Sequence, residues 1–213
     1  MKLCYVTDRK AFGGDADGQV RLLLEKIDSV ARAGVDWIQI REKDLPARAL
    51  SELVREALRR VPAACRVLLN DRLDMAFTIG AAGVHLGEHS LPAAEATRFL
   101  REQQHAGEFL VGVSTHSLEA ALQAEEAGAD YVIFGPVFAT PSKTQFGAPQ
   151  GVARLAEVCR QVSIPVIAIG GITVDNAKEC MVAGAGGIAA IRLFQDAADV
   201  GAVVSALRTQ TQR

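Results

Sequence analysis

The chain has 213 residues, of which 49% are apolar, enough to bury a substantial core in one large domain or two small ones. Its 23 lysines and arginines and 25 aspartates and glutamates give a net charge of −2, so no global positive field favours nucleic acid or an anionic membrane. No apolar run approaches membrane-spanning length, and the sequence begins directly with a strand-like segment, so we expect a soluble cytoplasmic protein. Four scattered cysteines at no zinc-binding spacing predict buried thiols in a reducing compartment.

Short β-rich apolar runs alternate with longer helical stretches along the whole chain. This alternation, with no linker rich in proline or glycine, predicts a single compact (β/α)₈ TIM barrel over residues 1–213. No GxGxxG follows the first strand, which disfavours an open dinucleotide-binding sheet. The expected strands, in chain order, are 3–7, 37–41, 66–70, 83–86, 110–114, 131–135, 166–170 and 187–191.

Four Ala-Gly phrases precede expected strands, and their glycines can take the left-handed conformation that ends a helix. We expect helices to end in this way at Gly34, Gly83, Gly128 and Gly184.

The second expected strand carries an unusual set of polar residues. Its alternation places Gln39, Arg41 and Lys43 on one face of a strand that the flanking sequence predicts to be enclosed on both sides. Buried positive charge requires a partner, so these residues indicate an anionic ligand. An ion pair with an internal carboxylate is the alternative that these residues leave open.

The next strands also end in polar residues, and the carboxyl ends of barrel strands are where active sites lie. Asn70 and Asp71 close the third strand, and Asp71 is a candidate magnesium ligand opposite the two cations. Its alternative role is to cap a helix beginning near Arg72. Among the histidines, His85 is more typical of a satisfied core residue, whereas His89 in a loop is the better functional candidate.

The longest expected loop follows the sixth strand. Hydroxyls at Thr140, Ser142 and Thr144 surround the cation of Lys143, a combination that suits a phosphate or pyrophosphate clamp on an active-site lid. A solvated surface loop is the alternative.

A second anion site is expected where barrels commonly bind phosphate, after the last two strands. Gly170 and Gly171 would let the backbone approach a ligand there, together with Ile191 and Arg192 after the eighth strand. Arg192 either adds charge to this site or pairs with a neighbouring acid. Two anion sites fit a substrate with a diphosphate and another with a monophosphate.

The whole chain resembles the family of thiamine phosphate synthases and the related thiazole tautomerases, compact (β/α)₈ barrels, and the synthases more closely. Each matching motif alone is weak, but seven in the right order are specific to this superfamily. The motifs span residues 6–9, 39–43, 70–72, 83–87, 112–114, 135–143 and 169–172.

The resemblance implies transfer of a hydroxymethylpyrimidine unit from its diphosphate to a thiazole phosphate, with loss of pyrophosphate and help from Mg²⁺. Asp71 would hold the metal, Lys143 the departing pyrophosphate, and Ser114 would face the pyrimidine; the last two are the candidate catalytic residues. The residues implied for the pyrimidine diphosphate are Gln39, Arg41, Lys43 and Asn70, and those for the thiazole phosphate are Thr140, Ser142, Gly171, Ile191 and Arg192. The sequence leaves the oligomeric state open, with a homo-oligomer as one alternative.

The chain also departs from the synthase pattern. Synthases usually present a glutamine after the motif ending in Gly87 and, two residues on, a second magnesium aspartate, whereas this chain has Glu88 and Ser90. We therefore expect Glu88 to be the second metal ligand, with His89 as the alternative. Pro136 stands where tautomerases have a histidine. A tautomerase-like isomerase and a non-catalytic phosphate-ligand binder are the alternative functions.

Overall fold

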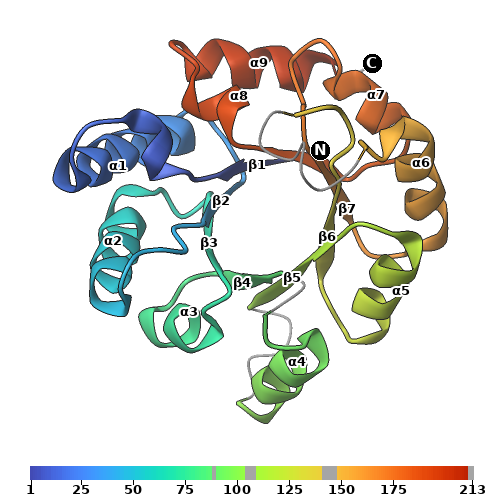
Figure 1. The fold of residues 1–213 in the computed structure, drawn as a ribbon, viewed down its shortest axis with the longest axis horizontal. Helices are drawn as coiled ribbons and strands as arrows, with labels where there is room; N and C mark the ends of the chain where they lie inside the picture. The colour runs from blue at the N-terminus through green and yellow to red at the C-terminus, as the bar shows by residue number, and fades with distance from the viewer. Residues whose placement is uncertain (88–89, 104–108, 141–147, 211–213) are drawn as a thin grey trace.

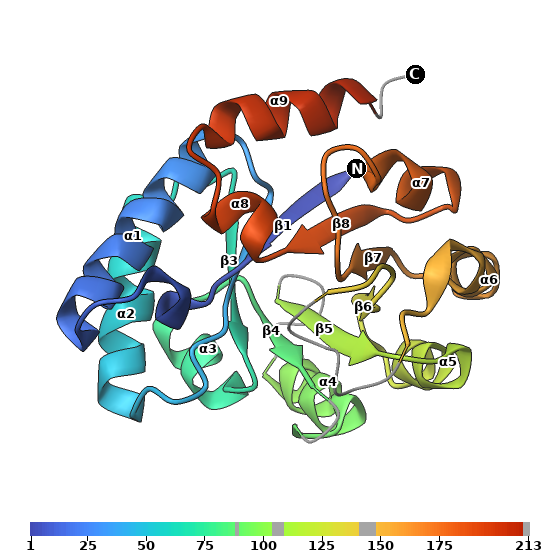
Figure 2. The same cartoon turned by 45° about the horizontal axis from the view of Figure 1, so that its top comes forward.

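Eight parallel strands close into a barrel in a computed structural model that describes residues 1–87, 90–103, 109–140 and 148–210. Each strand pairs with the next in sequence, and β8 pairs with β1. The strands form the inner ring and the helices surround it (Figures 1 and 2). The predicted (β/α)₈ barrel is confirmed, and each predicted strand lies within one residue of its bounds. The strands are β1 (Lys2–Val6), β2 (Trp37–Ile40), β3 (Arg66–Asn70), β4 (Gly83–Leu86), β5 (Leu110–Thr115), β6 (Tyr131–Phe134), β7 (Val166–Ile169) and β8 (Gly187–Ala190).

Helices follow the strands and cover the barrel from outside (Figure 1). Asp15 and Ser117 cap two of them by accepting backbone hydrogen bonds from Gly18 and Ala120. The helical elements of the described chain are η1 (Arg9–Phe12), α1 (Ala16–Arg32), α2 (Ala47–Arg60), α3 (Leu73–Ile79), α4 (Ala93–Glu102), α5 (Leu118–Glu126), α6 (Gly151–Gln161), α7 (Ala177–Val182), α8 (Arg192–Gln195) and α9 (Val200–Gln210).

Strand alternation divides the core into two parts. Ile38 and Ile40 pack outward with the helices, whereas Trp37 belongs to a smaller cluster inside the barrel. Gln39 alternates with the two isoleucines and is 3% exposed, so its amide lies inside the barrel. Polar residues at the carboxyl ends of the strands can therefore converge within this ring.

Three of the four predicted helix-ending glycines are confirmed by positive φ angles, at Gly34, Gly128 and Gly184. The fourth prediction is wrong, because α3 ends at Gly80 and Gly83 is already in β4. A Cβ on Gly83 would lie 2.3 Å from the carbonyl oxygen of Leu110, so this glycine permits close strand contact instead.

The thiols differ from expectation at one position. Cys4, Cys65 and Cys180 are buried as predicted, whereas Cys159 is only partly buried. Burial raises the pKa of the Cys159 thiol to about 11, so it stays protonated near neutral pH. Within the described ranges, no helix combines the length and the apolar character needed to cross a membrane.

Candidate active site

A chain of hydrogen bonds joins the predicted residues of β2 and β3. Gln39 donates from Nε2 to Oδ1 of Asn70 at 3.0 Å, and Asn70 donates from Nδ2 to Oδ2 of Asp71 at 2.6 Å. Both amides are buried, and each therefore has a fixed orientation. The structure thus brings together three of the residues that the sequence singled out.

Asp71 has a left-handed backbone, with φ of 63°, and is the only described non-glycine residue with a positive φ. Its Oδ1 accepts hydrogen bonds from the Gly87 N–H, at 3.4 Å, and from the Ser90 hydroxyl. Burial opposes ionisation of this carboxyl, but these bonds and the Lys43 charge outweigh it, so its pKa is below the ordinary value. The helix-cap alternative is wrong, because Arg72 occupies the cap position of α3 and the Asp71 carboxylate turns toward β4.

The two cations after β2 do not lie inside the barrel, which corrects the prediction of inward positive charge. The strand ends at Ile40, so the alternation stops there, and both Arg41 and Lys43 are exposed. Lys43 Nζ lies 3.5 Å from Oδ2 of Asp71, with 54% of its side chain exposed. Lys43 therefore contacts a carboxylate, as the ion-pair alternative proposed, at the mouth of the barrel.

The residue buried in this turn is Glu42, which the sequence reasoning missed. Its carboxylate accepts from the Thr7 hydroxyl at 2.6 Å and from Nη1 of Arg9 at 3.0 Å. Arg9 also pairs with Asp44, and this carboxylate raises the pKa of the Arg9 guanidinium. The backbone N–H of Arg41 donates to the Thr7 hydroxyl, so the network holds the β2 turn against the end of β1.

His85 lies below the mouth of the barrel and is 2% exposed. This confirms the prediction that His85 is a buried core residue. Its Nε2 lies 2.9 Å from the Ser114 hydroxyl, and its Nδ1 lies 3.2 Å from the Tyr131 hydroxyl. Burial lowers the pKa of His85 to about 3. The imidazole is therefore neutral at physiological pH, with one nitrogen that donates and one that accepts.

The segment after β6 is fixed to the end of β7. Val137 N–H donates to the Ile169 carbonyl at 2.8 Å, and Phe138 N–H donates to the Gly170 carbonyl at 3.0 Å. A Cβ on Gly171 would lie 2.4 Å from the carbonyl oxygen of Ala139, so the glycine is required for this contact. The close approach expected at Gly171 is thus made by another backbone segment, and it places the chain leading to Thr140 beside β7.

The residues after β8 are the remaining part of the second predicted anion site. Ile191 precedes α8, and Arg192 is its first residue and is exposed. Because β7 and β8 are neighbours, these residues and Gly170 share one side of the barrel mouth. The predicted Glu88, His89, Ser142, Lys143 and Thr144 lie outside the described residues.

Asp71 is suited to a hard cation such as Mg²⁺, which prefers oxygen ligands. Its carboxylate is ionised, partly exposed and oriented by Asn70 and Gly87. In the parts of the chain that the structure describes, no three acidic, histidine or cysteine side chains form a metal cluster.

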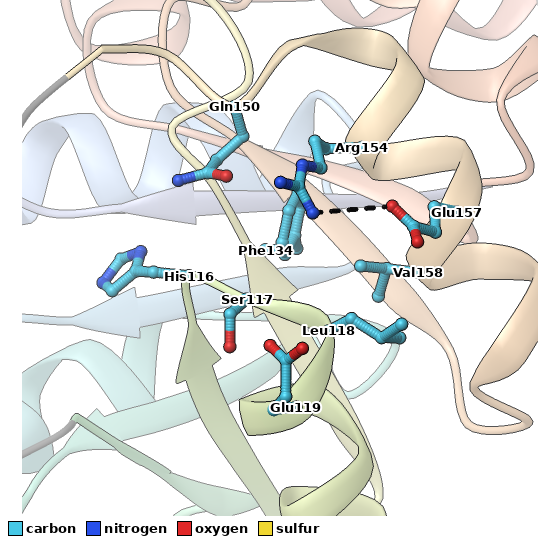
Figure 3. Close-up of a pocket in the computed structure, with 9 residues that line it drawn as sticks. All are labelled: His116, Ser117, Leu118, Glu119, Phe134, Gln150, Arg154, Glu157 and Val158. Carbon is cyan, nitrogen blue, oxygen red and sulfur yellow. Dashed lines mark ion pairs between the residues drawn. The ribbon is translucent and has the colours of Figure 1, made fainter.

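A cavity of about 280 Å³ lies outside the ring, between the starts of α5 and α6 (Figure 3). His116, Glu119 and Arg154 are among its lining residues, and Arg154 pairs there with Glu157 at 3.7 Å. None of the predicted site residues lines it. The convergent hydrogen bonds at the barrel mouth, rather than this cavity, therefore define the candidate active site.

Comparisons with known proteins agree on one family. A family model described as thiamine monophosphate synthase matches residues 3–194. A thiamine-phosphate synthase of Moorella thermoacetica is 40% identical over 211 residues, covering 98% of this chain and 95% of the relative. One from Roseiflexus castenholzii is 40% identical over 204 residues, covering 95% and 84%. The solved structure of a thiamine phosphate pyrophosphorylase from Pyrococcus furiosus aligns with a TM-score of 0.81 at 33% identity, covering 99% of this chain and 95% of that one.

Proposed function

The chain belongs to the thiamine monophosphate synthase family, and we propose that it joins hydroxymethylpyrimidine diphosphate to a thiazole phosphate with release of pyrophosphate, in thiamine biosynthesis. The observation that carries this assignment to named residues is the hydrogen-bonded chain from Gln39 through Asn70 to Asp71, with Lys43 beside it. It combines fixed amides, an ionised carboxylate and a cation at the barrel mouth.

In this reaction the bond between the pyrimidine methylene carbon and the diphosphate oxygen breaks, and that carbon forms a bond to the thiazole nitrogen. The electron pair of the broken bond leaves with pyrophosphate, so the developing negative charge needs stabilisation more than a proton needs removal. Lys43 and Arg41 are exposed at the mouth, where they would contact the diphosphate. Lys143 is proposed to hold the departing pyrophosphate.

Magnesium is proposed to bind at Asp71, where it would neutralise diphosphate charge during departure. The lowered pKa of Asp71 favours this role, because the carboxylate needs no deprotonation before it binds a cation. Glu88 is the proposed second ligand.

The pyrimidine itself would lie over Gln39 and Ser114, whose polar groups reach the mouth from β2 and β5. The thiazole phosphate would occupy the other side, near Thr140, Ser142, Gly170, Gly171, Ile191 and Arg192. The attachment of the β6 segment to β7 supports this assignment, because it gathers residues from both strands.

A pyrophosphate-release assay with both substrates, with and without Mg²⁺, tests the proposal. We expect release only when both substrates and the metal are present, and a large loss for Asp71→Asn. Absence of pyrophosphate under every condition would exclude the synthase. Release without metal would retain the synthase but exclude the magnesium site.

The two alternative functions predict different results. A tautomerase would isomerise a thiazole carboxylate phosphate without metal, but Pro136, packed beside Gly170, has no proton to transfer at that position. A non-catalytic binder would show ligand-induced thermal stabilisation without turnover.

A further inference from the structure

Two side chains meet across β5 on the inner face of the barrel. Gly112 lies in register between His85 of β4 and Tyr131 of β6. A Cβ at Gly112 would lie 2.0 Å from Cζ of Tyr131 and 2.3 Å from its hydroxyl oxygen. Because Gly112 has no side chain, the Tyr131 ring fits over this position and its hydroxyl reaches Nδ1 of His85.

Neighbouring rings restrict the position of Tyr131. The Trp37 ring lies against it with a centroid separation of 4.7 Å, and the His85 ring stacks with it at 5.7 Å. Tyr131 is 1% exposed, and burial raises the pKa of its phenol well above the ordinary value. Its hydroxyl thus keeps its proton and must donate it within the barrel.

His85 is 2% exposed and each of its ring nitrogens lies within hydrogen-bond distance of a hydroxyl, so a single ring hydrogen can be arranged in two ways. If Nδ1 carries the proton, it donates to Tyr131, and the phenolic hydrogen then has no acceptor among the hydrogen bonds of the described residues. If Nε2 carries the proton, Tyr131 donates to Nδ1 and Nε2–H donates to the Ser114 hydroxyl. The second arrangement gives both the Tyr131 hydroxyl and the His85 ring N–H an acceptor. It is favoured because a buried donor without an acceptor costs free energy.

We propose that Tyr131 and His85 are positioning residues that hold Ser114 as a hydrogen-bond donor toward the substrate. The Ser114 oxygen accepts from His85, so the serine hydrogen is directed to the barrel mouth. This deepens the proposed function and rests on it, because the acceptor would be a ring nitrogen of the pyrimidine. A ligand that offers an N–H at that place, instead of a lone pair, would be rejected.

The tautomer of His85 can be measured without turnover. Nitrogen NMR of histidine-labelled protein, with the His85 signals assigned by their loss in His85→Gln, should show Nε2 protonated and Nδ1 unprotonated. A protonated Nδ1 would overturn the proposal. This result is independent of the enzyme assay, so it still decides the arrangement if the wild type releases no pyrophosphate and the proposed function fails.

A double-mutant cycle then tests whether Tyr131 acts through Ser114. Tyr131→Phe should lower kcat/KM for the pyrimidine diphosphate by about three- to ten-fold, the range for one neutral hydrogen bond, with the KM for the thiazole phosphate unchanged. In a Ser114→Ala background the same substitution should have little further effect. Equal losses in both backgrounds, or no loss in either, would overturn the positioning role.

Tyr5→Phe is the matched control. It removes another buried tyrosine hydroxyl, which donates to Oε1 of Gln195 at 2.8 Å on the outer side of the barrel wall. We expect it to lower stability without lowering kcat/KM for the pyrimidine diphosphate. A comparable fall in that kcat/KM would attribute the Tyr131→Phe effect to general destabilisation and overturn the proposal.

Discussion

The Ser90 hydroxyl donates a hydrogen bond to Oδ1 of the Asp71 carboxylate. The two residues face each other from the ends of β3 and β4, and the Gly87 N–H contacts both of them. A serine therefore orients Asp71 where the synthase pattern has a second carboxylate. Position 90 therefore offers a neutral hydroxyl to the Asp71 carboxylate, and an aspartate there would add a negative charge beside it.

Ser90→Asp should strengthen Mg²⁺ binding to the free protein by about ten-fold, because ligand charge sets affinity at oxygen sites. Without metal the variant should be less stable than the wild type, since two carboxylates would repel each other. Thermal unfolding across a Mg²⁺ titration measures both effects. Ser90→Asn is the neutral control and should show neither, and equal Mg²⁺-induced shifts in all three proteins would contradict the prediction.

Glu42→Gln should lower the free energy of unfolding by about 2 kcal/mol, because it removes the buried charged partner of Arg9 and leaves only the half-exposed Asp44 to pair with the guanidinium. The side chains of Arg9 and Glu42 are 8% and 2% exposed. Urea unfolding measures the loss. Glu52→Gln, which removes an exposed carboxylate paired with Arg48, should leave the midpoint nearly unchanged. Similar effects of the two substitutions would argue against a structural role for the buried pair.

The stability of the protein should fall as the pH drops through the range set by His85. Burial lowers its pKa from 6.5 to about 3; the Asp71 charge opposes this shift, and Arg41 and Lys43 add to it. Between these values the unfolded chain binds a proton that the folded protein does not, so stability decreases by up to about 1.4 kcal/mol per pH unit as pH falls.

His85→Gln removes this contribution. Its free energy of unfolding, measured by urea titration between about pH 4 and pH 7, should depend less steeply on pH than that of the wild type. Parallel pH profiles of the two proteins would show that His85 is not buried in its neutral form.

Gly171→Ala should raise the KM for the thiazole phosphate at least about ten-fold, because the new methyl group would displace the Ala139 carbonyl and with it the chain leading to Thr140. The KM for the pyrimidine diphosphate should change little. Gly13→Ala is the control for backbone strain, since Gly13 has φ of 70°, close to the 64° of Gly171, but no heavy atom within 4 Å of the new Cβ. Unchanged steady-state kinetics in Gly171→Ala would show that Gly171 does not contribute to the thiazole phosphate site.

The strands were predictable because buried parallel strands are short apolar runs separated by long helical stretches, and this pattern needs no tertiary information. The cations after β2 were misplaced because the alternation argument extends only as far as the strand itself. The strand ends at Ile40, so Arg41 does not point inward as expected, and Glu42 is the buried residue instead. A strand end is decided by pairing with neighbouring strands, which a local pattern does not contain.

The partners of His85 and Glu42 were equally inaccessible to sequence reasoning. Gly112 inside a strand was the one local sign of a close approach, but it did not say which residues approach. Thr7 and Arg9 reach Glu42 across more than thirty residues of chain.

The sequence by itself determined the barrel, the end of the barrel at which polar residues gather, and the family to which they belong, because periodicity and motif order are properties of the chain. Only the tertiary structure decided which of these residues are buried and which side chains are paired by a hydrogen bond or an ion pair. Those properties depend on contacts between distant strands, such as His85 with Tyr131 across Gly112, that form only when the sheet closes.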